Sequence, residues 1–206
     1  MSRTIVRANL ARLRSEGLVQ AKPRRTATVA RPSLEEASAV FELRRALERE
    51  AVKLAIRRWR PEYGAVLDGH IREEDAATAR RDERLSIRLA GEFHVKLARM
   101  SGNVELERVL SQFASRCSLI LALHARPHSS ECAVAERSAI VAALRSGDAA
   151  NAVRLAEEHV GSVEKRARLA DPRGDASLGA FLSRYAEAIE VKTSAALPLK
   201  RRKPSS

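Results

Sequence analysis

Residues 139–159, AIVAALRSGDAANAVRLAEEH, contain two helical patterns separated by a four-residue break. Apolar residues on both sides of the break recur every three or four positions, which is the period of a helix with one buried face. Within the break, Gly147 suits the left-handed conformation that ends a helix, and Asp148 suits the position that caps the next one. The stretch therefore predicts two antiparallel helices joined by a tight turn.

The same helical period continues through most of the chain from residue 33 onward. Ser33 and Glu36 form a capping box that predicts a helix start, and SGN at 101–103 predicts a helix end. Three further apolar stripes have helical spacing: Val40, Leu43, Leu47, Ala51 and Leu54; Leu85, Leu89, Phe93, Leu97 and Met100; and Leu106, Val109, Leu110, Phe113, Ile120 and Leu121. We predict an all-α fold, with an antiparallel helical bundle over residues 33–169.

Residues 1–31 form a separate, strongly basic segment. Its first part is an amphipathic helix with a cationic side, which Ser2 caps and Gly17 ends. Two short β-branched arms follow, at 18–20 and 26–29, around a basic turn. They predict a small hairpin resembling the wing of a winged helix.

The chain of 206 residues is 45% hydrophobic and 31% charged, which is typical of a globular, helix-rich protein. Its 38 lysines and arginines outnumber its 26 acids, giving a formal net charge of +12. This excess favours an anionic partner, either nucleic acid, an acidic membrane surface, or a small carboxylate or phosphate. Charge alone does not choose among them.

The sequence contains no apolar run near the roughly 20 residues that a membrane span needs, and no apolar signal-peptide core at its start. We therefore expect a cytoplasmic protein without a membrane partner. Cys117 and Cys132 lack metal-binding or redox spacing, so two reduced thiols are expected. Residues 170–206 are expected to form a linker, a short helix and a basic tail.

Four stretches carry a family resemblance. SRTIVRANLARLRSEGLVQ at 2–20 resembles the recognition helix and following turn of GntR-type winged-helix regulators, whose motif reads approximately SRTPVREALRRLEAEGLV. VFELRRALE at 40–48, EFHVKLARMSGN at 92–103 and the opening stretch at 139–159 resemble, in order, the helical FCD ligand-binding domain of the FadR subgroup. The resemblance implies a ligand-responsive DNA-binding repressor and not an enzyme.

Members of this family begin with a helix and the first half of the helix-turn-helix, which this chain lacks. We expect the front of the DNA-binding domain to be missing, through a start codon placed too far downstream or a real truncation. The domains are then a partial winged helix at 1–31, an FCD-like domain at 33–169, and the segment 170–206. In the alternative, the chain is a truncated helical ligand-binding protein that has lost DNA binding.

The resemblance places Arg3, Thr4 and Arg7 at the start of the recognition helix, where side chains reach base edges and phosphates in the major groove. Arg24 and Arg25, in the turn of the wing, are expected to contact phosphates. The implied partner is a double-stranded DNA operator read by a homodimer. The alternative is that these arginines form a solvated helix face.

Inside the helical domain, five polar residues fall on or beside apolar stripes: Arg44, His94, Arg116, Arg137 and His159. A guanidinium on a buried face needs a partner, so these residues are candidates for an effector site. The alternative is that they form salt bridges within the domain, with Glu48 or Glu136, and hydrogen-bonded core histidines.

Family members commonly hold a divalent metal with one aspartate and three histidines. In this chain Ala90 and Arg137 stand at two of those positions, and only His94 and His159 remain as remnant ligands. The substitution implies a site without metal or other cofactor. We expect a small carboxylate effector, with Arg137 and Arg44 as main anchors and His94, Arg116 and His159 as supporting donors. A metal-dependent enzyme is disfavoured, because the histidines lack carboxylate ligands and no nucleophile or phosphate loop is evident.

Overall fold

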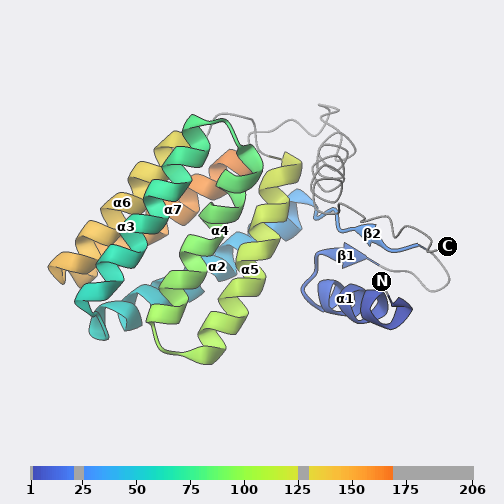
Figure 1. Cartoon of the computed structure of the whole chain (residues 1–206), viewed down its shortest axis with the longest axis horizontal. Helices are drawn as coiled ribbons and strands as arrows, with labels where there is room; N and C mark the ends of the chain where they lie inside the picture. The colour runs from blue at the N-terminus through green and yellow to red at the C-terminus, as the bar shows by residue number, and fades with distance from the viewer. Residues whose placement is uncertain (1, 21–25, 125–129, 169–206) are drawn as a thin grey trace, which may run out of the picture. The chain divides into compact units, whose positions relative to one another are not determined.

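The computed structural model describes residues 2–20, 26–124 and 130–168. It contains a short helix, a two-stranded hairpin and six long helices within these residues (Figure 1). The elements are α1 (Arg3–Ser15), β1 (Val19–Gln20), β2 (Thr28–Val29), α2 (Leu34–Arg57), α3 (Pro61–Ala79), α4 (Glu83–Met100), α5 (Val104–His124), α6 (Ser130–Ser146) and α7 (Ala149–Arg168). The predicted all-α architecture, with a partial winged helix before it, is confirmed.

The N-terminal elements form as their sequence predicts. The Ser2 hydroxyl accepts a hydrogen bond from the Thr4 amide at 3.3 Å, and Gly17 takes a φ of +74° after α1. β1 and β2 pair antiparallel, with Val19 opposite Val29. The turn that carries Arg24 and Arg25 lies outside the described residues, as does the segment 169–206.

The helices of the bundle begin and end at local signals. In the capping box of α2, the Glu36 amide donates to the Ser33 hydroxyl at 3.1 Å and the Ser33 amide donates to the Glu36 carboxylate at 2.7 Å. Between α6 and α7, Gly147 has a φ of +75° and Asp148 accepts from the Asn151 amide at 3.1 Å. The turn predicted at 145–148 is therefore confirmed.

α2 runs through the bundle and packs against α7, α5 and α4, while α3 packs against α4 and α6 (Figure 1). The largest apolar cluster contains Leu67 of α3, Phe93 and Leu97 of α4, and Leu144 of α6. A second surrounds Phe41 of α2. Burial of this apolar surface is the main force that holds the helices together. The sequence patterns did not single out α3, because it buries the small and polar residues Gly64, His70, Glu74 and Ala77 along with Leu67 and Ile71.

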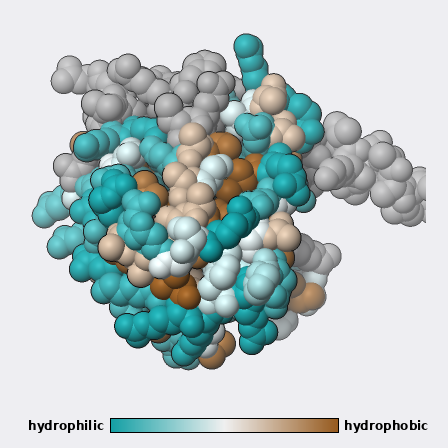
Figure 2. Space-filling model, turned by 90° about the vertical axis from the view of Figure 1, so that its left-hand side faces the viewer, coloured by the Kyte–Doolittle hydropathy of each residue, from teal (hydrophilic) through white to brown (hydrophobic). Residues whose placement is uncertain are grey.

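The surface of the bundle is mostly polar. The face in Figure 2 is largely hydrophilic, and its hydrophobic residues lie in small groups. None of the described helices combines the length and the apolar character that a membrane crossing requires.

Candidate functional site

A chain of buried polar contacts joins α2 to α4. Arg44 and Glu48 lie one turn apart on α2, and the Arg44 Nε donates to the Glu48 Oε1 at 2.7 Å. The second Glu48 oxygen lies 2.8 Å from Nδ1 of His94 on α4. All three residues are buried. Because a carboxylate oxygen accepts, Nδ1 of His94 must carry the proton.

His94 in turn stacks on His159 of α7. Their ring centroids are 5.2 Å apart, and the ring planes differ by 19°. Nδ1 of His159 lies 2.6 Å from the Glu136 Oε2 on α6, and it is the donor for the same reason. The Nε2 atom of His159 is buried and has no hydrogen-bond partner. Each imidazole is therefore oriented by its own carboxylate.

A second ion pair lies in the same interior. The Nη2 atom of Arg137, on α6, donates to the Oε1 atom of Glu74, on α3, and both side chains are almost fully buried. The Arg137 guanidinium carbon lies 6.0 Å from the centroid of Phe93, whose ring is edge-on to His94. The Nε of Arg137 and the Oε2 of Glu74 have no partner. One hydrogen bond therefore joins the pair, and one donor (Arg137 Nε) and one acceptor (Glu74 Oε2) have no hydrogen-bond partner.

Burial controls the protonation of these groups. Burial, followed by the charge of Arg44, lowers the pKa of His94 to about 3, although Glu48 opposes this. Burial also lowers the pKa of His159, although the hydrogen bond with Glu136 acts to raise it. For Glu48, burial alone would raise the pKa, but the contacts with His94 and Arg44 outweigh it and hold it below its usual value. At neutral pH the two stacked imidazoles are therefore uncharged.

In the ion pair of Arg137 and Glu74, burial has the largest effect on the pKa of each group. Burial raises the pKa of Glu74 and lowers the pKa of Arg137, and their mutual attraction opposes both shifts without reversing either. For both groups, burial therefore has a larger effect on the pKa than the attraction between the two charges.

A cavity of about 130 Å³ opens beside the stacked histidines. It is lined by His159 and Ser162 together with Leu155, Glu136 and Glu158. Arg166 of α7 lies 3.5 Å from Glu136, one of the lining residues. The cavity could admit only a small molecule.

Four of the five predicted effector residues meet in this interior: Arg44, His94, Arg137 and His159. Arg116 shows no contact with them among the described residues. It is half-buried on α5, with its guanidinium 5.6 Å from the Phe113 ring. The alternative of contacts within the domain is also realised, because Arg44 forms an ion pair with Glu48 and His159 donates a hydrogen bond to Glu136. Glu74 was missed, since its partner lies 63 positions away in the sequence.

The residues present do not fit the metal site that the family pattern implies. Ala90 has no ligand atom, and Arg137 brings a positive charge to the position of another ligand. Within the described residues, no group of three or more His, Cys, Asp and Glu side chains could hold a metal ion. That the purified protein contains no metal remains a prediction.

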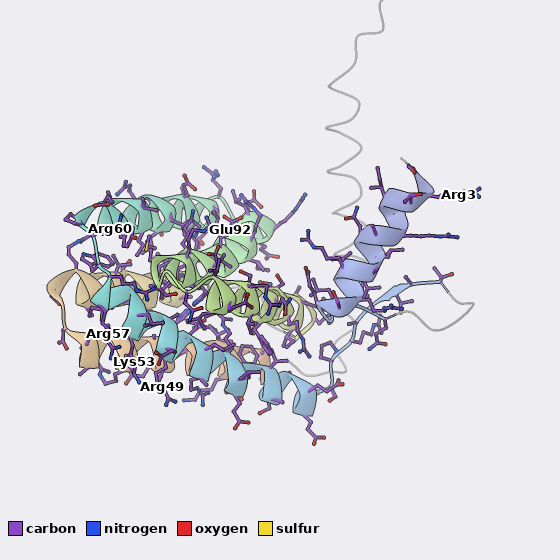
Figure 3. The ribbon with its side chains drawn as sticks, turned by 90° about the horizontal axis from the view of Figure 1, so that it is seen from below. Arg3, Arg49, Lys53, Arg57, Arg60 and Glu92 are labelled. Atoms are coloured by element: carbon purple, nitrogen blue, oxygen red, sulfur yellow. The ribbon has the colours of Figure 1, made fainter. Side chains whose placement is uncertain are left out.

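The predicted DNA-contacting residues Arg3, Thr4 and Arg7 are exposed on α1. Figure 3 shows Arg3 in the first turn, extending away from the helix. α1 has no buried residue. The arginines are therefore free to contact an external partner, as either the DNA-binding or the solvated-face interpretation requires.

Basic residues also line one side of α2, where Arg49, Lys53 and Arg57 follow one another (Figure 3). Arg49 pairs with Glu157 of α7 at 2.6 Å, and Arg45 pairs with Glu164 at 2.8 Å. Arg57 lies in the last turn of α2, where the helix dipole favours a cation. The net charge of the chain is thus not concentrated on α1 alone.

The buried histidines predict a loss of stability in mild acid. His94, His159 and His70, whose Nε2 donates to the Leu89 carbonyl at 2.8 Å, all have lowered pKa values in the folded state. The unfolded chain therefore binds more protons below about pH 6.5, and each histidine lowers the free energy of unfolding by up to about 1.4 kcal/mol per pH unit. The raised pKa of Glu74 gives a smaller slope of opposite sign.

Urea titrations at about pH 7.5, 6.5 and 5.5 measure this slope. We expect full stability at the highest pH and a progressive loss toward the lowest, with a shallower loss in His70→Gln. A free energy of unfolding that stays constant or rises on acidification would contradict the buried, neutral state of the histidines.

Comparisons with known proteins agree with this architecture. The model of the FCD domain matches residues 39–162, which is more than half of the chain. No curated protein matched by sequence. Among solved structures, E. coli McbR/YncC superposes with a TM-score of 0.72 at 20% identity, covering 82% of this chain and 86% of that one.

Two further structures show the same fold. A putative transcriptional regulator GntR from Rhodococcus sp. RHA1 has a TM-score of 0.68 at 18% identity, covering 82% of this chain and 81% of its own. Streptococcus agalactiae GntR has a TM-score of 0.57 at 19% identity, covering 80% and 82%. The chain belongs to the FCD-domain family.

Proposed function

We propose that this regulator binds an operator in double-stranded DNA through α1 and releases it when a small organic anion occupies the FCD domain. It acts in the cytoplasm as a homodimeric repressor. The observation that carries the proposal is the buried cluster of charged and imidazole side chains beside a small cavity. Buried charges are costly to desolvate, and groups with strongly shifted pKa values cluster at functional sites, which supports a ligand site here.

The DNA-binding half of the proposal rests on α1 and its motif. The helix presents Arg3, Thr4 and Arg7 in its first two turns, where a recognition helix meets base edges. Arginine is suited to guanine because its two parallel donors reach O6 and N7 together. Arg24 and Arg25 would add phosphate contacts that hold the orientation.

The effector half rests on the cations of the cluster. Arg44, Arg137 and Arg166 are matched by Glu48, Glu74 and Glu136, so the interior is close to neutral. The Nε donor of Arg137 has no hydrogen-bond partner, and Arg166 lies 3.5 Å from Glu136. Arg137 is therefore the principal anchor for a carboxylate, while Arg44 fixes Glu48 and His94 around it.

The absence of buried residues in α1 also favours a second candidate function. A helix that buries none of its residues would equally suit a ligand-binding module that has lost DNA binding. DNA-binding measurements with matched arginine variants separate the two functions.

Replacing Arg3 or Arg7 by Ala should weaken binding to a duplex selected by this protein from a random library by about 1–3 kcal/mol for each good base contact. Arg12→Ala is the matched control, because Arg12 is exposed on the same helix and paired with Glu16 at 2.9 Å. Fluorescence anisotropy at two salt concentrations measures the effect. Equal losses in all three variants would indicate nonspecific charge attraction, and failure to select any duplex would favour the second candidate function.

Replacing Arg137 by Gln should abolish thermal stabilisation of the protein by small carboxylates, because the anchoring charge is removed. Arg145→Gln is the control, since Arg145 lies on the same helix but pairs at the surface with Asp68. Elemental analysis of untagged protein is expected to show no stoichiometric metal. An undiminished carboxylate response in Arg137→Gln would refute the anchor, and stoichiometric zinc, nickel or manganese lost in His94→Ala would refute the metal-free site.

A dimer is expected because operators of winged-helix proteins contain two half-sites that mirror a protein two-fold axis. Light scattering at tens of micromolar protein should give twice the mass of the 22.7 kDa chain. A uniform monomer at that concentration would argue against the proposed mode of operator recognition.

A further inference from the structure

The end of α1 meets α5 where Gly17 and Arg116 come together. Gly17 lies in the turn between α1 and β1 and takes a φ of +74°, a left-handed conformation that favours glycine. A Cβ atom at this position would lie 3.2 Å from the Nε of Arg116, 3.4 Å from its Cδ and 3.6 Å from its Cζ. The Arg116 side chain therefore lies directly against the backbone of Gly17, in space that a larger residue would need.

Arg116 also has contacts that lead into the bundle. Its guanidinium carbon lies 5.6 Å from the centroid of the Phe113 ring, on the preceding turn of α5. Phe113 packs against the apolar cluster around Phe41 of α2, and this cluster also contains Cys117, the residue after Arg116. Arg116 therefore connects the turn at Gly17 with the interior of the bundle.

Hydrogen bonding does not explain the position of the Arg116 side chain. Its Nε atom is buried and has no hydrogen-bond partner. A buried donor without a partner is unfavourable, and a long charged side chain ordinarily keeps its polar end in water. Packing against Gly17 and Phe113 is therefore what holds the guanidinium in place.

α1 is covered at its C-terminal end and exposed at its N-terminal end. Leu13, Glu16, Gly17 and Leu18 are half-buried, whereas every residue from 2 to 12 is exposed. The proposed DNA-contacting residues thus project from a helix that the rest of the protein contacts only near its last turn.

This geometry makes contacts with bases sensitive to the orientation of α1. The helix has 13 residues, which at 1.5 Å per residue is a length of about 20 Å. A rotation of roughly 10° about its C-terminal end would displace Arg3 by about 3.5 Å. Hydrogen-bond lengths vary by only about half an ångström, so such a rotation would break contacts with base edges.

We propose that Arg116 is a positioning residue for DNA binding: by packing on Gly17, it fixes the orientation of α1 on the helical bundle. The two recognition helices of a dimer then meet two half-sites at the required spacing. This inference rests on the proposed function, because it takes α1 as the DNA-binding helix. It gives Arg116, which does not join the buried polar contacts, a role outside the effector site.

Hydrogen exchange of the full chain tests the contact without DNA. The backbone amides of residues 16–18 donate to carbonyls of α1 at 2.9–3.0 Å and close the end of the helix. In Arg116→Ala they should exchange at least about threefold faster, because the packing that protects the turn is lost. Arg108→Ala is the matched control, since Arg108 is exposed on the same helix and pairs with Glu105 at 2.8 Å.

Gly17→Ala tests the same contact from the other side. It adds a methyl group against Arg116 and should also accelerate exchange in the turn. Gly147→Ala is the matched control for backbone strain, because Gly147 has a φ of +75° and nothing lies within 4 Å of an added Cβ. Acceleration at 16–18 in Gly17→Ala should exceed the acceleration at 147–148 in Gly147→Ala. In the double variant with Arg116→Ala, the two effects should be less than additive.

DNA binding tests whether the contact serves recognition. The probes are a duplex selected by this protein, with two half-sites, and the same duplex with one half-site scrambled. The second half-site binds with an effective concentration that depends on how well the two helices are positioned. Arg116→Ala should therefore weaken binding to the intact duplex by about tenfold, and to the scrambled duplex by about twofold or less. Arg116→Lys keeps the charge without the planar guanidinium and should resemble Arg116→Ala.

The outcomes separate this inference from the proposed function. Unchanged exchange at 16–18 in Arg116→Ala, or additive effects in the double variant, would overturn the contact. Equal losses on the two duplexes, or full DNA binding in Arg116→Lys, would overturn the positioning role and leave DNA binding by α1 intact. Failure to select any duplex would contradict the proposed function, while the exchange rates would still decide whether Arg116 holds α1. If Arg116→Ala does not fold, Arg116→Gln replaces it in both measurements.

Discussion

Glu48 is the residue on which the interior of the bundle depends. Its carboxylate accepts from Arg44 on its own helix and from His94 on α4, at 2.7 and 2.8 Å. A buried carboxylate is tolerated only when it is paired and hydrogen-bonded, so the two contacts fix α4 against α2 in one register. They also fix the proton of His94 on Nδ1.

From His94 the polar contacts continue across the bundle. His94 stacks on His159 of α7, which donates a hydrogen bond to Glu136 of α6. The next residue of α6, Arg137, donates to Glu74 of α3. A ligand that alters these contacts therefore acts on five helices at once. α2 begins directly after residues 30–33, which follow β2, and the Ala30 amide donates to the Leu18 carbonyl at 2.9 Å. The connection between the hairpin and the most central helix of the bundle is therefore short.

Much of this arrangement could be predicted from the sequence. Local signals set the helix ends at Ser33 and Gly147, and charged residues on apolar stripes pointed to Arg44, Arg137 and the two histidines. Glu48 was visible as a possible partner of Arg44 because it lies one helical turn away. Glu74 was not, since long-range pairing leaves no periodic signal and α3 has a weak apolar stripe. Arg116 has the same pattern as Arg44, but periodicity alone cannot tell which of the two side chains joins the buried polar contacts.

Two carboxylates hold two neutral imidazoles with Nδ1 protonated, so each ring keeps its Nε2 atom as an acceptor. Nitrogen-15 NMR of the histidine side chains tests this arrangement most directly, with His94→Gln and His159→Gln to assign the signals. We expect both rings to be neutral near pH 7, as the Nδ1–H tautomer, and His94 to remain neutral down to about pH 5. Imidazolium signals for either residue near pH 7, or an Nε2–H tautomer, would contradict the account.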